Sequence, residues 1–578
     1  MSKVLRINMD NRTTTYEDAP EKYKFLAGRA LTSTIIYDEV DPTCHPLGPN
    51  NKLIFAPGIT TGTNAPSSGR ISVGAKSPLT GGIKESNAGT VWSQLVARLG
   101  LKAIIVEGQA DGWWGAHITK DGVEFFDADE YAGKSLYEIF PGLFERFGDK
   151  VGIAAIGVAG EMKMAMGGIC FNDIDNRPSR YSGRGGLGAV MGSKGIKFIV
   201  VDGAGGPGVE IANKELFDKG RKKLVDAIRS HALTKPGGGL NSYGTAVLVN
   251  IINEAGALPT RNFREGRFEG AAKISGEAMA EFCEERGGVG MMGHACHPGC
   301  IIKCSNVIPN PDGSELASCI EYETTWALGA NCGIDDLDVV GKLTQMCNDI
   351  GIDTIEAGDV IAVAMDAGLA EFGDGEAAIG MLEDVRQGTP LGRILGQGTG
   401  FTAKALGVIR SPDVKGQGMP AYEPRAIKGI GITYAISTMG ADHTSGYTIA
   451  PEIAGVGGKV DQFDTDKAAL VRAFQYTTAF IDTSGHCLFI AFPILDIAEG
   501  FEGLVEECAG VFGVEWTGDD VTRIGKEVLD REIAFNRAAG LTKADDRLPE
   551  FMKYEKLPPH NVVWDVPDET LDAVFGEA

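Results

Sequence analysis

The feature that most restricts the fold is a change of pattern near residues 204–208. Before it, short apolar runs alternate with turn residues, which is typical of β-strands. The runs are LIFA (53–56), AIIVEG (103–108), VGIAAIGVAG (151–160) and IKFIVVDG (196–203). After it, apolar residues recur at helical spacing, and helices are expected at about 214–233 and 336–348.

This pattern predicts an α+β chain with a β-rich N-terminal domain followed by two mainly helical domains. The stretch 407–424 contains several glycines and prolines and is expected to be a linker within the helical part. The predicted domains are therefore residues 1–206, 207–415 and 416–578.

Composition excludes several classes of function. The formal charge of −24 argues against nucleic acid as a partner, because phosphate binding needs clustered Lys and Arg. No apolar run reaches the roughly 18 residues that a spanning helix needs. The N-terminal residues lack a secretory pattern, so we expect a cytoplasmic protein. The 80 dispersed glycines suggest many places where backbone approaches a bulky ligand.

Three cysteines lie close together in HACHPGCIIKCSN, at positions 296, 300 and 304. The chain has 11 cysteines, an odd number, and no secretory signal, which favours metal or redox chemistry over a disulfide framework. Cubane 4Fe–4S clusters need four thiolates, so a fourth ligand is missing from this segment. Cys487 is a candidate because it follows a glycine turn between apolar runs.

Other readings of these cysteines stay open at this point. They could be ordinary core residues, or three of them could bind zinc together with His294 or His297. The spacing does not fit the cysteine pattern of radical-SAM enzymes.

A glycine loop, SGRGGLGAVMGSKG (182–195), contains G-x-G-x-x-G at Gly183, Gly185 and Gly188. A dinucleotide fold needs a long helix directly after this motif. The strand-like run 196–203 follows too soon for that helix. Backbone N–H groups of the loop and Arg184 suit an anion, and we do not expect it to be NAD.

Taken together, several segments resemble the aldehyde:ferredoxin oxidoreductase family, and the resemblance runs almost end to end. It is closest to the large subunits of bacterial enzymes that work beside iron–sulfur and flavin subunits. The segments are GRALTSTIIYDEVDPTCHPLGPNNKLIFAPG, SGRISVGAKSPLTGGIKESNAG, YSGRGGLGAVMGSKGIKFIVVDG, the cysteine triplet, EYETTWALG, NDIGIDTI and DTSGHCLF.

The resemblance implies a tungsten bis-pyranopterin, a 4Fe–4S cluster and Mg²⁺, held where a two-sheet domain meets two helical domains. The family's motif D-x-x-G-L-(C/D) matches twice, and its final cysteine supplies the fourth cluster ligand. The implied cluster ligands are Cys296, Cys300, Cys304 and Cys487. The implied cofactor-binding residues are Arg70, Asn87, Gly183, Arg184, Gly185, Asn348, Gly351, Ile352, Asp353, Asp482, Gly485 and His486.

Some positions depart from the family pattern. Asn348 replaces the leading Asp of the first motif, which puts one charged pterin contact in doubt, and His486 replaces Leu in the second. The first gap of the cysteine triplet is one residue longer than usual. No histidine lies between His297 and His443, so an iron site of the E-x-x-H type at a dimer interface is not expected.

The resemblance further implies oxidation of an aldehyde to a carboxylic acid, with electrons leaving singly through the cluster. The acceptor would be ferredoxin or partner subunits of an oligomeric complex, including one that carries FAD or uses NAD. Glu323 and His443 match the family's residues beside the metal, as general base and hydrogen-bond donor. Glu321 is the competing carboxylate.

Two rival functions remain. The chain could be the tungsten subunit of a benzoyl-coenzyme A reductase, which would place a cysteine at the metal, and Cys319 is the candidate. Alternatively, it could be a non-catalytic iron–sulfur carrier or scaffold, against which the pterin motifs count.

Overall fold

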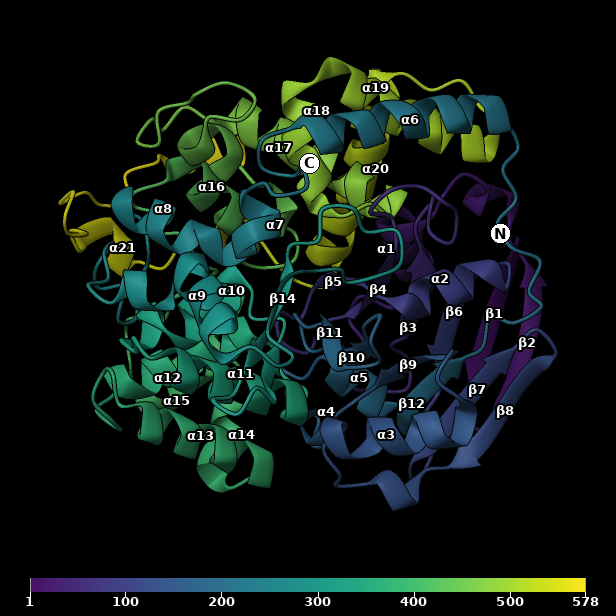
Figure 1. Ribbon diagram of the computed structural model, residues 1–578, viewed down its shortest axis with the longest axis horizontal. Coiled ribbons are helices and arrows are strands. Elements are labelled where there is room, and N and C mark those ends of the chain that lie inside the picture. Colours follow the sequence, from purple (N-terminus) through teal and green to yellow (C-terminus); the bar gives the residue numbers. More distant parts are fainter. Residues whose placement is uncertain (1, 577–578) are drawn as a thin grey trace.

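The N-terminal part contains two six-stranded sheets, seen at the lower right of Figure 1. The computed structural model describes residues 2–576. The first sheet has the order β2 (Thr13–Asp18), β1 (Lys3–Asn8), β6 (Leu101–Glu107), β3 (Leu53–Pro57), β4 (Arg70–Lys76), β5 (Ile83–Gly89). The second has the order β11 (Pro178–Ser182), β10 (Ile169–Asn172), β9 (Gly152–Ala155), β12 (Ile196–Val201), β7 (Trp114–Thr119), β8 (Gly122–Asp127).

The two sheets share one apolar core. Trp92, on helix α2 (Val91–Arg98), is fully buried, and its ring lies 5.2 Å from that of Phe55 in the first sheet. It lies 5.6 Å from the ring of Phe171 in the second sheet. Such aromatic contacts bury much apolar area per residue and hold the sheets together. The predicted β-rich domain with two sheets is confirmed.

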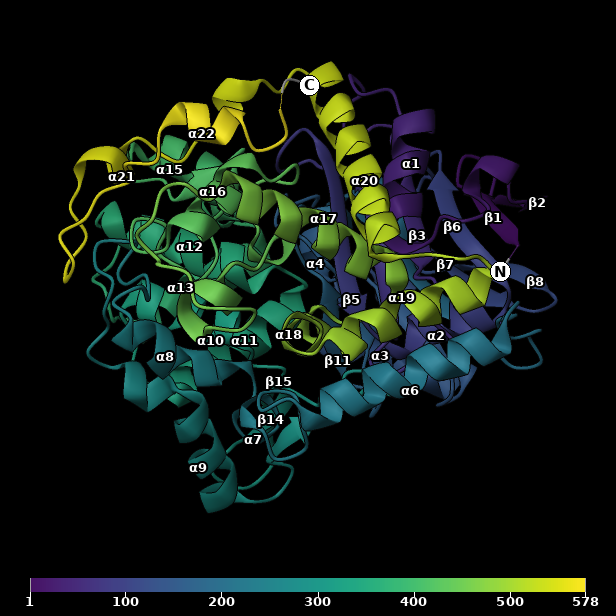
Figure 2. The ribbon, with the colours of Figure 1, turned by 90° about the horizontal axis from the view of Figure 1, so that it is seen from above.

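The remainder is mainly helical, as predicted (Figures 1 and 2). The helices that contribute residues to the site are α8 (Leu248–Glu254), α10 (Tyr322–Leu328), α11 (Leu337–Ile350), α12 (Thr354–Asp366) and α17 (Ala468–Ser484). A small sheet of β13 (Met291–His294), β14 (Ser305–Pro309) and β15 (Glu315–Ser318) carries the cysteine loop. Helix α6 (Lys214–Ser230) lies beside α19 (Ala498–Phe512) in both views, although far from it in sequence.

Three local features can be compared with the expectations. Helix α6 ends at Ser230 rather than at residue 233, because His231 is extended and bonds to Asp496 at 3.0 Å. The expected linker 407–424 contains a short hairpin, and its end is buried rather than exposed. The glycine loop does open a helix, α5 (Leu187–Ser193), but this helix has only 7 residues, so the long helix of a dinucleotide fold does not follow the loop. The next strand, β12, pairs antiparallel with β9 as well as parallel with β7.

Within residues 2–576, no helix has both the length and the apolar character that crossing a membrane requires.

Candidate active site

A cavity of about 390 Å³ lies where the sheets meet the helical part. Its walls come from β4, β5, β11, the cysteine loop, the start of α10 and the turns after α11 and α17. Most of the predicted site residues line it: Arg70, Asn87, Gly183, Arg184, Cys296, Cys300, Cys304, Glu323, Asn348, Ile352, Asp353, His443, Asp482 and Cys487. Four predicted residues lie behind this lining: Gly185, Gly351, Gly485 and His486.

The two D-x-x-G-like motifs have the same local structure. Each glycine ends a helix in the left-handed conformation, Gly351 after α11 (φ 83°) and Gly485 after α17 (φ 87°). Glycine is favoured there because other residues are strained at positive φ. Each glycine also contacts the backbone of the N-terminal β-rich domain: Gly351 lies against Gly157, and Gly485 lies against Gly58. The motifs therefore fix the two helix ends to the ends of β9 and β3.

We expect Gly485→Ala to destabilise the protein more than Gly407→Ala. Both positions are left-handed helix ends, so both variants carry backbone strain of about 1–3 kcal/mol. A Cβ on Gly485 would also lie 2.3 Å from the Thr61 hydroxyl, whereas one on Gly407 meets nothing within 4 Å. Thermal unfolding of the two variants measures the difference, and equal melting temperatures would show that the close approach is unimportant.

His486, which stands in the Leu place of the second motif, points away from the cavity. It is fully buried, with its Nδ1 2.9 Å from the Ser484 hydroxyl and its Nε2 3.3 Å from the Glu507 carboxylate. Glu507 is also fully buried. The imidazole therefore occupies a core position next to Cys487 and does not line the cavity.

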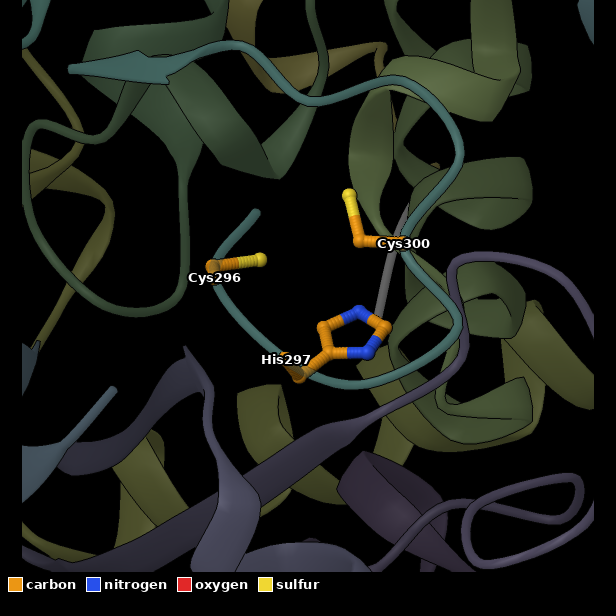
Figure 3. Close-up of side chains that lie close together, drawn as sticks. All are labelled: Cys296, His297 and Cys300. Carbon is orange, nitrogen blue, oxygen red and sulfur yellow. The ribbon is translucent and has the colours of Figure 1, made fainter. Parts of the chain in front are cut away.

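The cysteine loop gathers sulfur atoms at one end of the cavity. One ligand atom from each of Cys296, His297 and Cys300 lies within 4.8 Å of the others, and all three side chains lie on the inner side of the loop (Figure 3). Both ring nitrogens of His297 already have backbone partners: Gly69 N–H donates to Nε2 at 3.3 Å, and Nδ1 bonds to the Pro298 carbonyl at 2.9 Å. This leaves no lone pair of His297 for a zinc ion.

Cys487 is held against the same loop through one residue that the sequence did not single out. The carbonyl of Ser67 accepts from Cys487 N–H at 2.8 Å, and Ser67 N–H donates to the carbonyl of Gly299 at 2.9 Å. Cys304 lines the same cavity. Burial raises the pKa of both Cys304 and Cys487, so a positive metal centre would favour their thiolate forms. Four cysteines lining one cavity fit the donor set of a 4Fe–4S cluster.

Glu323 and His443 lie side by side in the cavity lining. Glu323 Oε2 accepts from Ala421 N–H at 2.8 Å, and Oε1 lies 3.3 Å from His443 Nε2 without hydrogen-bond geometry. Among the described residues, neither Glu323 Oε1 nor His443 Nδ1 has a hydrogen-bond partner. Burial raises the pKa of Glu323 to about 8 and lowers that of His443 to about 4. Such shifted groups in a cavity are typical of catalytic acids and bases.

Glu321 has a different environment. Its carboxylate accepts from the Thr245 hydroxyl at 2.6 Å and from the Cys319 thiol at 3.4 Å. Both carboxylate oxygens of Glu321 therefore already accept a hydrogen bond, one of them from a cysteine thiol.

The predicted cofactor-binding residues are held by one another or by backbone. Arg70 bonds to Asn87, including its carbonyl at 3.1 Å. Arg184 donates to Asp353 at 3.0 Å and to the carbonyls of Gly418 and Ala441.

The residues of the two motifs are held as well. Asn348 donates to the Ser318 carbonyl at 3.2 Å. Burial raises the pKa of Asp482 to about 7, although Arg29 lies 3.2 Å away. Their exact contacts with a cofactor stay predictions.

Sequence reasoning missed several lining residues. Lys84, fully buried on β5, bonds to Asp442 at 3.2 Å beside His443. An aromatic wall also adjoins His443, with the rings of Tyr422 and Tyr447 at 5.9 and 6.2 Å. A lysine inside a buried strand was an available signal, whereas the aromatic wall was not readable because its members are spread over the chain.

The chain belongs to the aldehyde ferredoxin oxidoreductase family and is an oxidoreductase. A family model described as the N-terminal domain of aldehyde ferredoxin oxidoreductase matches residues 4–203. A second, described as domains 2 and 3, matches residues 219–575.

Curated relatives agree with this. The chain is 38% identical to the tungsten-containing aldehyde ferredoxin oxidoreductase of Pyrococcus horikoshii, over 96% of this chain and 92% of that one. It is 37% identical to the protein of the same name from Pyrococcus furiosus, with the same coverage. An aliphatic sulfonate oxidoreductase, WOR-like subunit, of Pyrococcus furiosus is 26% identical over 93% of this chain and 86% of that one.

Among solved structures, the active-site complex BamBC of benzoyl coenzyme A reductase has the same fold. The TM-score is 0.80, with 99% of this chain and 93% of that chain covered. At 19% identity, this likeness concerns the fold alone.

Proposed function

We propose that the protein oxidises aldehydes to carboxylic acids with a tungsten bis-pyranopterin, and that electrons leave singly through a 4Fe–4S cluster to ferredoxin or partner subunits. One observation carries this proposal: a single cavity is lined both by the adjacent Glu323–His443 pair and by the four cysteines Cys296, Cys300, Cys304 and Cys487. The names of the relatives at 37–38% identity support tungsten and aldehydes.

The cavity residues suit such a cofactor. Arg70, Asn87, Arg184 and the Gly183–Gly185 loop would hold the pterin phosphates and Mg²⁺ on the sheet side. Asn348, Ile352, Asp353 and Asp482 would contact the pterin rings from the helix ends. When bound, the tungsten cofactor supplies two-electron oxidation, and the cluster supplies one-electron transfer.

The protein's own step is proton handling. Conversion of an aldehyde and water to an acid releases two electrons and two protons. The Glu323 carboxylate would remove a proton from water or from hydrated aldehyde through its free Oε1. His443 is neutral at pH 7 because burial lowers its pKa to about 4, and its Nε2–H can donate to the substrate oxygen.

The raised pKa of Glu323 predicts the pH dependence of turnover. A general base must be deprotonated, so kcat/KM is expected to fall about tenfold per pH unit below pH 8. It should level off above that pH. His443 should add no change between pH 5 and 8, because its pKa is lower still. A pH series with a viologen acceptor measures the profile, and a flat profile from pH 6 to 9 would contradict the role of Glu323.

The function itself is tested with protein from cells supplied with tungstate. Aldehyde-dependent reduction of a viologen, with tungsten and iron both bound, would support the proposal. Iron without tungsten or molybdenum would favour a non-catalytic electron carrier. Activity with benzoyl-coenzyme A and none with aldehydes would favour the reductase alternative, for which Cys319 in the cavity wall is the specific observation.

We also propose that the chain divides into domains at residues 1–206, 207–415 and 416–578. We further propose that the protein works in a complex with electron-transfer subunits.

A further inference from the structure

Arg180 differs from Arg184 and Lys84, two other buried cations that line the cavity. It projects from β11 into the cavity and is only 7% exposed. Arg184 lies 3.0 Å from Asp353, and Lys84 lies 3.2 Å from Asp442. In contrast, within residues 2–576, no carboxylate oxygen lies within 4.0 Å of the Arg180 guanidinium. Arg180 is therefore a buried cation that makes no direct ion pair in the described part of the chain, and Glu321 and Asp173 act on it only from beyond ion-pair distance.

The groups that Arg180 contacts directly are not carboxylates. It donates to the Ser305 hydroxyl at 2.8 Å and to the Cys319 sulfur at 3.2 Å, and lies 3.4 Å from His294 Nδ1. Its Nε–H has no partner among the described residues. Burial raises the pKa of Cys319 to about 12, so that thiol carries no charge at neutral pH. Because the nearest carboxylates, Glu321 and Asp173, lie beyond ion-pair distance, the buried guanidinium favours a further negative charge directly beside it.

The position of Arg180 indicates which anion this is. Ser305 directly follows Cys304, and His294 is two residues before Cys296, so the guanidinium contacts both ends of the cysteine loop. Cys296 and Cys304 line the cavity with it. A cluster bound by four thiolates carries net negative charge, which increases when the cluster accepts an electron. Net charge and hydrogen bonds to sulfur are the main determinants of cluster potential.

We propose that Arg180 is the counter-cation of the cluster and that its charge makes the cluster easier to reduce. This positioning role rests on the proposed function, because it needs a cluster at the four cysteines. When bound at these cysteines, the cluster would supply one-electron transfer between the cofactor and the acceptor. Arg180 stabilises the more negative, reduced cluster and itself neither gains nor loses an electron.

The test is a redox titration of the cluster in the full-length protein, followed by electron paramagnetic resonance. Arg180→Gln is expected to lower the equilibrium constant for cluster reduction about tenfold, which corresponds to about 59 mV for one electron. Arg180→Lys keeps the charge and should restore most of the potential. Arg286→Gln is the matched control, because Arg286 is paired with Asp338 at 2.7 Å and does not line the cavity.

The potential is measured only on molecules that contain the cluster, so partial cluster loss does not obscure it. Equal potentials for wild type and Arg180→Gln would overturn the proposal while leaving the proposed function intact. If Arg180→Gln binds no iron, Arg180→Lys decides: a potential like that of the wild type supports the role of charge, and loss of iron there overturns it. A wild-type protein without any cluster would overturn both proposals.

Discussion

Replacement of Glu323 by glutamine is expected to lower kcat by about 10²–10⁴-fold, the usual contribution of a general base. Glutamine keeps the shape of the side chain and can still accept from Ala421 N–H, but it cannot take up a proton. Tungsten and iron contents should stay at wild-type values. Steady-state aldehyde oxidation with a viologen acceptor, together with metal analysis, measures both quantities.

Glu321→Gln is the comparison for this variant. Both oxygens of Glu321 are already bonded to Thr245 and Cys319, so it is poorly placed to accept a proton from substrate. We expect its kcat to fall less than about tenfold, below the range for a lost general base. If Glu323→Gln kept its activity and Glu321→Gln lost it, the assignment of the base would have to be reversed.

Replacement of Cys487 by serine is expected to remove most of the iron and all electron transfer to ferredoxin. A 4Fe–4S cluster needs four thiolates, and the other three lie in a single loop. Iron analysis and the absorbance of the cluster measure the loss.

Cys283→Ser is the matched control for Cys487. Cys283 is also buried and lies near the cysteine loop, but its thiol donates to the Val307 carbonyl at 3.5 Å and does not line the cavity. Its variant should keep full iron. Full iron in Cys487→Ser as well would exclude Cys487 from the ligand set.

The fold class could be predicted because periodicity is local. The run 103–108 appears as β6, and the apolar positions of 336–348 form one buried side of α11. The strand order of the two sheets could not be read in this way, because pairing such as β1 with β6 joins residues about a hundred positions apart. Long-range pairing depends on the whole chain and leaves no short pattern in the sequence.

The candidate site was predictable where a residue type and a motif coincide, as at Cys296 and Glu323. It was not predictable where the direction of a side chain determines whether the residue lines the cavity. His486 stands beside Cys487, but it turns into the core to meet Glu507, which lies on another helix. Arg180 had a weak signal, since it is a charged residue on a short strand before the glycine loop, and its neighbours Ser179 and Tyr181 line the cavity as well.

Because the cavity wall is built from segments scattered along the chain, the site can form only late in biosynthesis. The lining begins with Arg70 and ends with Phe489, and every part of the wall is supplied by a different stretch between them. An amino-terminal fragment on the ribosome therefore lacks the segment that carries Cys487 and Asp482. The cofactor can be enclosed only after the turn following α17 has left the ribosome, so loading belongs to a late stage of biosynthesis.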